Sequence, residues 1–178
     1  TNGGGQTEAG IFSNLKYNDY MDTDSEKMAS AGRPIITNME FKIVDEKDVE
    51  VPPDIVGELV VRGDNVMKGY WDMPDETSDS IRSGWQHTGD LCKVDKDGFL
   101  YYVDRKKDMI KSGGENVYSK EVEEVLYTSP DIMEAAIIGV PDEKWGEMVK
   151  AMVVLKEGKQ TTEKDIIAFC KKELAGFK

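Results

Sequence analysis

The sequence is poor in the residues and segments on which several classes of protein depend. Its 178 residues include two cysteines, Cys92 and Cys170, and a single histidine. Two distant cysteines without metal-ligand spacing fit reduced thiols better than a disulfide framework. No apolar run approaches the roughly 20 residues of a membrane span, and the start of the chain lacks the basic and apolar segments of a signal peptide. We therefore expect a soluble, cytoplasmic protein without a transmembrane segment.

Basic charge is also scarce: 23 Lys and Arg face 35 Asp and Glu, a net charge of −12. This acidic surplus argues against non-specific nucleic-acid binding. Most of the surplus lies in residues 1–103, which carry 10 basic and 20 acidic side chains, whereas residues 104–178 carry 13 and 15. With 39% hydrophobic residues, the chain can bury a core, and its length suits one domain or two small ones. The charge step suggests two.

The first part of the chain is predicted to be β-rich. Residues Met39–Val44 alternate between apolar and other side chains, as in a strand with one buried face. Glu58–Arg62 is a second short strand, and Leu91–Val94 can pair with Phe99–Val103 across the turn at Asp95–Gly98. That turn lacks the downstream glutamate of a calcium-binding loop. We expect residues 1–103 to form one β-rich unit.

The second part mixes helices and strands. Ser119 can cap a helix that ends before Pro130, and two apolar, β-branched runs, Ala135–Val140 and Met148–Leu155, indicate buried strands. Thr162–Asp165 resembles a capping box that opens a second helix. The predicted fold class is α+β, with a small α+β unit at residues 109–178 following the β-rich unit.

Residues Gly3–Glu8 form the first segment that could bind a ligand. Glycines such as Gly5 let backbone amides approach an anion, the Thr7 hydroxyl can donate to a phosphate oxygen, and Glu8 offers hard oxygen ligands for Mg²⁺. A flexible glycine loop without a ligand explains the same residues.

The second segment, Trp85–Asp90, leads into a predicted strand. Asp90 follows a glycine and is well placed to accept hydrogen bonds from two neighbouring hydroxyls, such as those of a ribose. The alternative is an Asx turn that only begins the strand. His87 has no catalytic partner nearby in sequence, so we interpret it as a positioning or packing residue.

The third segment runs from Asp104 to Asn116 across the charge step. It contains four basic residues and the pair Gly113 and Gly114, where a chain can swivel or approach a ligand closely. A solvated charge run on a linker is the alternative interpretation.

These three segments occur in one order together with Gly57–Gly63, Met67–Trp71 and then Pro74, Glu76 and Thr77. In this order and spacing the chain resembles the adenylate-forming superfamily, which contains acyl-CoA synthetases, adenylation domains of peptide synthetases and firefly luciferase. The resemblance covers nearly the whole chain. It implies a ligase that converts a carboxylic acid and ATP into an acyl-adenylate, and then transfers the acyl group to coenzyme A.

The resemblance also implies a role for each site residue. In the first unit, Thr7, with Gly5 beside it, would contact the phosphate of ATP or AMP, and Glu8 would hold Mg²⁺. Asp90 would accept from both ribose hydroxyls, and Arg105 would be a further ribose contact. These residues would bind the nucleotide at the end of a large AMP-binding domain.

The remaining roles fall at and after the charge step. Residues 104–108 would form a hinge, with Lys107 as the residue about which the small domain rotates between the two half-reactions. Lys111 and the turn at Gly113 and Gly114 would face the active site in the thioester-forming step, near the pantetheine arm of CoA. We expect 109–178 to be a C-terminal lid domain without its last segment.

The sequence also departs from the family pattern. Gly4 stands where the family has an aromatic residue that lines the adenine pocket. The phosphate loop, the acyl pocket and the last catalytic lysine of the family have no counterpart in these residues. We therefore expect a fragment that is inactive alone, from an enzyme that uses a fatty or aryl acid. A domain that loads a carrier protein and a non-catalytic interaction domain remain alternatives.

Overall fold

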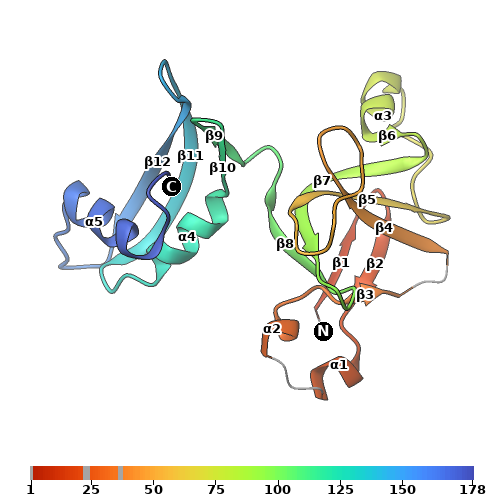
Figure 1. The fold of residues 1–178 in the computed structure, drawn as a ribbon, viewed down its shortest axis with the longest axis horizontal. Coiled ribbons are helices and arrows are strands. Elements are labelled where there is room, and N and C mark those ends of the chain that lie inside the picture. The colour runs from red at the N-terminus through yellow and green to blue at the C-terminus, as the bar shows by residue number, and fades with distance from the viewer. Residues whose placement is uncertain (1, 22–24, 36–37) are drawn as a thin grey trace. The chain divides into compact units, whose positions relative to one another are not determined.

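The computed structural model describes residues 2–21, 25–35 and 38–178. The chain separates into two compact units, one ending at Lys106 and the other covering Lys107–Lys178. Both units combine helices with strands, which confirms the predicted α+β class (Figure 1). The boundary between the units falls inside residues 104–108, where the sequence predicts a hinge.

Two antiparallel sheets account for the strands described in the first unit. The order of the smaller is β1-β2-β3, and the order of the larger is β4-β5-β7-β6, with β8 also paired to β7. The strands are β1 (Gly3–Gln6), β2 (Gly10–Asn14), β3 (Arg33–Pro34), β4 (Met39–Val44), β5 (Gly57–Gly63), β6 (Ile81–Arg82), β7 (Trp85–Val94) and β8 (Leu100–Arg105). The helices are α1 (Tyr17–Met21), α2 (Ser25–Met28) and α3 (Pro74–Ser80).

The predicted strands of this unit are confirmed, with the bounds of β5, β7 and β8 moved. β4 has the predicted bounds, whereas β7 begins at Trp85, earlier than the sequence indicated. The β7–β8 turn is a hairpin turn, as predicted. The Asp95 carboxylate accepts from the amides of Asp97 and Phe99, each at 2.9 Å, and these two hydrogen bonds close the turn.

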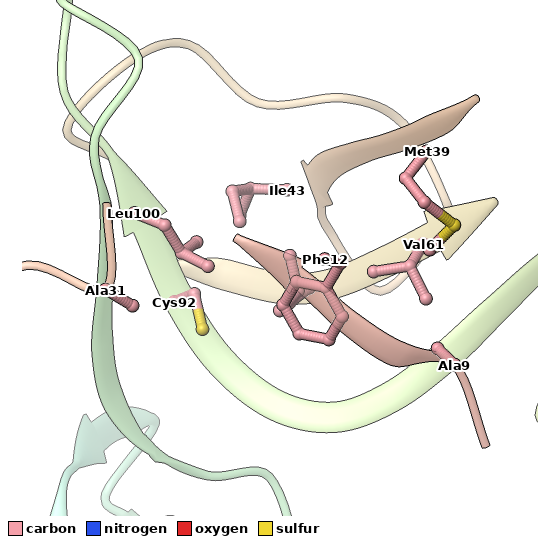
Figure 2. Close-up of a cluster of buried hydrophobic side chains, with 9 residues drawn as sticks. Ala9, Phe12, Ala31, Met39, Ile43, Val61, Cys92 and Leu100 are labelled. Atoms are coloured by element: carbon pink, nitrogen blue, oxygen red, sulfur yellow. The ribbon is translucent and has the colours of Figure 1, made fainter. Parts of the chain in front are cut away.

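One apolar cluster joins the two sheets of the first unit. Figure 2 shows Phe12 of β2 in this cluster with Ile43 of β4, Val61 of β5 and Leu100 of β8, all of them at most 4% exposed. Cys92 of β7 belongs to the same cluster, and burial raises the pKa of its thiol. Burial of this shared apolar surface fixes the β1–β2 hairpin against the larger sheet.

The second unit is a sheet of order β10-β9-β12-β11 packed with two helices. Its elements are β9 (Ile110–Ser112), β10 (Glu115–Val117), α4 (Ser119–Tyr127), β11 (Ile132–Asp142), β12 (Gly146–Leu155) and α5 (Glu163–Glu173). The buried cluster of the unit consists of Ile110, Val117, Val122, Leu126, Ile132 and Ile137. Ile166, Cys170 and Leu174 pack against this cluster, so α5 and the residue that follows it cover part of the core.

The two helix starts of this unit differ from each other. The capping box at α5 is confirmed, because the Thr162 side chain accepts from the Asp165 amide while Asp165 accepts from the Thr162 amide. The predicted cap at Ser119 is wrong. Tyr118 is the N-cap, with no side-chain cap hydrogen bond, and Ser119 is the first helical residue and is buried. An apolar pattern locates a helix only to within a residue or two.

No helix among the described residues is long and apolar enough to cross a membrane.

Candidate nucleotide site

The segment Thr7–Ala9 forms the tip of the β1–β2 hairpin. Gln6 pairs with Gly10, which has a φ of +62°, a backbone conformation that suits glycine. The Ala9 side chain is fully buried, whereas Thr7 is exposed and Glu8 is partly exposed. Core packing therefore anchors one end of the tip and leaves the Thr7 hydroxyl accessible from solvent.

Glu8 is held by the segment that follows β5. The Tyr70 hydroxyl donates to Glu8 Oε1 at 3.0 Å, and the Met67 amide donates to the Glu8 carbonyl oxygen at 2.7 Å. Burial and the hydrogen bond to Glu8 both raise the pKa of Tyr70, so its hydroxyl remains a donor at neutral pH. The contact from Met67 fixes the Glu8 backbone, and the contact from Tyr70 orients its carboxylate.

Gly4 is closely surrounded by side chains of the neighbouring strands. It is buried in β1, and its amide donates to Ser13 Oγ at 3.0 Å. A Cβ atom built on Gly4 would lie 2.5 Å from Ser13 Oγ, 2.8 Å from Tyr102 Oη and 2.9 Å from a ring carbon of Phe12. A larger residue at this position would therefore force side chains of β2 and β8 to move.

Asp90 is presented by an irregularity in the pairing of β5 with β7. Glu58 pairs with Leu91 and Val60 pairs with His87, so that Leu59 faces the three residues 88–90. The Thr88 hydroxyl donates to the Leu59 carbonyl at 2.8 Å and accepts from the Asp90 amide at 3.1 Å. Such a bulge turns a side chain out of the regular alternation of a strand.

The pairing of β7 with β8 brings Asp90 and Arg105 together, two residues that were predicted to bind the same ribose. They pair across β7 and β8, and Arg105 Nε lies 3.0 Å from Asp90 Oδ1. Burial raises the pKa of Asp90, the charge of Arg105 lowers it, and the charge of Glu58 raises it further, so that the pKa is raised overall. The ionised form of Asp90 is thus unfavourable for the fold. Perturbed carboxylates of this kind are enriched at functional sites.

Glu58 is a neighbour of this pair that the sequence reasoning missed. It is 6% exposed, and its carboxylate binds Lys106 Nζ at 2.8 Å, His87 Nδ1 at 3.0 Å and the Gly89 amide at 3.3 Å. Burial alone would raise the pKa of Glu58, but the hydrogen bonds from Lys106 and His87 outweigh burial and lower it overall. The available signal was a carboxylate directly before three consecutive apolar residues, Leu59–Val61.

His87, which the sequence suggested as a positioning or packing residue, is largely enclosed by polar partners. Its side chain is 6% exposed, and Nδ1 lies close both to Glu58 and, at 2.6 Å, to Arg82 Nη2. These contacts hold the imidazole in place.

Three of the four predicted residues of the second unit, Lys111, Gly113 and Gly114, lie together on one hairpin. Gly113 and Gly114, with φ of +62° and +87°, connect β9 to β10. The Lys111 amide donates to Glu147 Oε2 at 2.7 Å, and the Gly113 amide donates to the Trp145 carbonyl at 2.8 Å. Lys107 is exposed and is the first residue of this unit.

A magnesium ion fits Glu8 only as one ligand among several. Within the described residues, no group of three or more His, Cys, Asp or Glu side chains could enclose a metal ion. Mg²⁺ commonly binds through one or two carboxylates, water and the phosphates of a substrate. A single oriented carboxylate is consistent with this second kind of site.

Comparison with known proteins gives the family to which the chain belongs. The model of the AMP-binding enzyme family matches residues 1–71, and the model of the AMP-binding enzyme C-terminal domain matches residues 121–178. The two matches occur in the order in which the large and small domains were predicted. The chain belongs to the adenylate-forming superfamily.

Individual relatives agree with this family assignment. A 2-succinylbenzoate–CoA ligase of Bacillus mycoides is 48% identical over 161 residues, which cover 90% of this chain and 32% of the relative. A long-chain-fatty-acid–CoA ligase of Escherichia coli is 48% identical over 149 residues, covering 84% and 26%. The structure of o-succinylbenzoate CoA synthetase from Bacillus subtilis with its acyl-adenylate intermediate has a TM-score of 0.84 and 37% identity, covering 98% and 35%. The chain thus spans about a third of the length of these relatives.

Proposed function

We propose that this chain is part of an ATP-dependent acyl-CoA ligase. The carboxylate of the acid attacks the α-phosphate of ATP, which forms an acyl-adenylate and releases pyrophosphate. The thiol of CoA then attacks the acyl carbon, forms a thioester and releases AMP. The single observation that carries the proposal is the Asp90–Arg105 pair. In this pair the fold keeps a carboxylate, Asp90, whose negative charge lowers the stability of the folded chain.

In the first unit, we assign the nucleotide contacts. Asp90 accepts hydrogen bonds from the two ribose hydroxyls, and Arg105 orients Asp90 while contacting the ribose itself. Thr7 donates to a phosphate oxygen from the exposed hairpin tip, where Gly5 leaves the backbone accessible. Glu8 is the protein ligand for Mg²⁺, which when bound neutralises charge on the phosphates. The contact from Tyr70 supports this assignment because it fixes the carboxylate.

In the second unit, we assign the residues for thioester formation. Lys111 and the turn at Gly113 and Gly114 serve the step in which CoA enters. Lys107 is the hinge residue, and the boundary of the two compact units between Lys106 and Lys107 supports this assignment. The acyl substrate is a fatty or aryl acid, by analogy with the names of the relatives. We place the enzyme in the cytoplasm.

The test measures both half-reactions in a full-length enzyme that carries this sequence. Pyrophosphate release is measured with ATP, Mg²⁺ and a panel of acids, and thioester formation is measured after CoA is added. Asp90→Asn should weaken AMP binding, whereas Asp97→Asn, a carboxylate in the nearby hairpin turn, should not. Failure of the wild type to bind ATP or AMP would favour a non-catalytic interaction domain. Transfer to a carrier protein but not to CoA would favour an adenylation module.

The hinge assignment has its own test. Lys107→Pro restricts φ at this residue and the conformation of the residue before it, whereas Lys107→Ala removes the side chain and leaves the backbone free. We expect the proline variant to lose one half-reaction and keep the other, and the alanine variant to keep both. Equal loss of both half-reactions in the proline variant, or of neither, would refute the assignment.

A further inference from the structure

The carboxylate of Glu58 occupies a central place in the first unit. It is 6% exposed and lies on β5. Its two oxygens have different partners: Oε1 accepts from the Gly89 amide at 3.3 Å, and Oε2 accepts from Lys106 Nζ at 2.8 Å. A carboxylate is almost never buried to this degree unless it is paired.

The partners of Glu58 bracket the Asp90–Arg105 pair. Gly89 directly precedes Asp90, and Lys106 directly follows Arg105. A further backbone hydrogen bond, from the Lys106 amide to the Gly89 carbonyl at 2.8 Å, joins these two neighbours. One buried side chain therefore fixes both strands at the point where the proposed ribose contacts lie.

The position of Glu58 is unfavourable for a purely structural residue. Its negative charge is one of the causes that raise the pKa of Asp90. An apolar residue in β5 would avoid this repulsion. Lys106, which neutralises Glu58, is also the last residue of the first unit, so the ion pair holds the chain directly before the unit boundary.

We propose that Glu58 is a positioning residue, which holds the Asp90–Arg105 pair in register and fixes the end of the first unit at Lys106. This inference rests on the proposed nucleotide site. Glu58 itself acts through Gly89 and Lys106 and has no assigned contact with the nucleotide.

The first experiment needs only the 178-residue chain. Amide hydrogen exchange is measured at Gly89 and Lys106 in the wild type, in Glu58→Gln and in Lys106→Met. The matched control is Glu40→Gln, which breaks an ion pair of the same length, 2.8 Å to Arg62, on the same sheet. We expect exchange at both amides to become about 10-fold faster in the two test variants and to remain unchanged in the control. Unchanged exchange in both test variants would overturn the proposal.

The second experiment measures the Kd for AMP in a full-length enzyme that carries this sequence. Glu58→Gln and Lys106→Met should each weaken AMP binding about 5-fold or more, and the double variant should be no weaker than the worse single variant. Lys106→Arg, which keeps the charge, should bind AMP as the wild type does. The Lys106 side chain is 45% exposed, so substitutions there leave no cavity in the core. The Lys106 variants therefore still test the proposal if Glu58→Gln does not fold.

The outcomes separate the inference from the function on which it rests. A wild type that binds neither ATP nor AMP overturns the proposed function. If the wild type binds AMP and Lys106→Met binds it equally well, only the positioning role is overturned. If the Kd of the double variant rises by the product of the two single-variant factors, Glu58 and Lys106 act independently. That result would also overturn the positioning role.

Discussion

Replacing Asp90 by asparagine should change stability and nucleotide binding in opposite directions. The pair that Asp90 makes with Arg105 involves a side chain that is 63% exposed, and such pairs contribute about 0.2–1 kcal/mol. Since burial and the charge of Glu58 raise the pKa of Asp90 despite Arg105, the unfavourable effects exceed this contribution. We therefore expect Asp90→Asn to keep or increase the free energy of unfolding of the first unit at pH 7.

Nucleotide binding should instead become weaker. A hydrogen bond to a charged acceptor contributes about 1.5–3 kcal/mol, and asparagine replaces one carboxylate oxygen by a donor. The loss of one such bond to a ribose hydroxyl corresponds to about 10- to 150-fold in Kd. Calorimetric titration of AMP into a full-length enzyme that carries this sequence measures this effect.

The pH dependence gives the sign of the stability effect. The folded state holds the Asp90 proton more tightly than the unfolded state, so the wild type loses stability relative to Asp90→Asn as pH rises from the ordinary value of 3.8 through the raised pKa. Below pH 3.8 this difference should vanish.

Urea unfolding provides the measurement. In a Trp145→Phe background, the fluorescence of Trp71 and Trp85 reports on the first unit. Asp97→Asn is the control with the opposite sign, because the hydrogen bond from Lys27 lowers the pKa of Asp97. A clear loss of stability in Asp90→Asn at pH 7 would refute the reasoning.

Three further changes test the local structure. Thr162→Ala removes the capping box of α5 and should lower the stability of the second unit by about 1 kcal/mol, measured by Trp145 fluorescence; an unchanged midpoint would contradict the observed cap. Leu126→Ala, at a fully buried position, should cost the same unit about 2–5 kcal/mol without moving the unfolding of the first unit. Tyr70→Phe removes the hydrogen bond to Glu8 and should weaken binding of Mg²⁺ and ATP while changing stability by less than about 1.5 kcal/mol; equal binding would show that Tyr70 does not orient Glu8.

Short sequence patterns predicted the helices and strands of this fold, but not all of their bounds. Alternation identified β4, and the Thr162–Asp165 spacing identified the start of α5, because both signals act over a few residues. The Ser119 cap failed because the same pattern allows a start one residue earlier.

The candidate site shows the same division. Motif order identified Asp90 and Arg105, and the structure brings them within 3.0 Å. Glu58 could not be identified in this way, because its contacts depend on the register shift between β5 and β7 and join residues 31 and 48 positions apart. Register is set by core packing of both strands, which no local window of sequence contains.

The crowding at Gly4 has a consequence for how this site can vary among related sequences. Ser13, Phe12 and Tyr102 already occupy the space into which a side chain at position 4 would project. A single substitution of Gly4 by an aromatic residue would therefore force these side chains to move. A larger residue at position 4 should therefore occur together with changes at positions 13 and 102, because the built Cβ lies 2.5 Å from Ser13 Oγ and 2.8 Å from Tyr102 Oη.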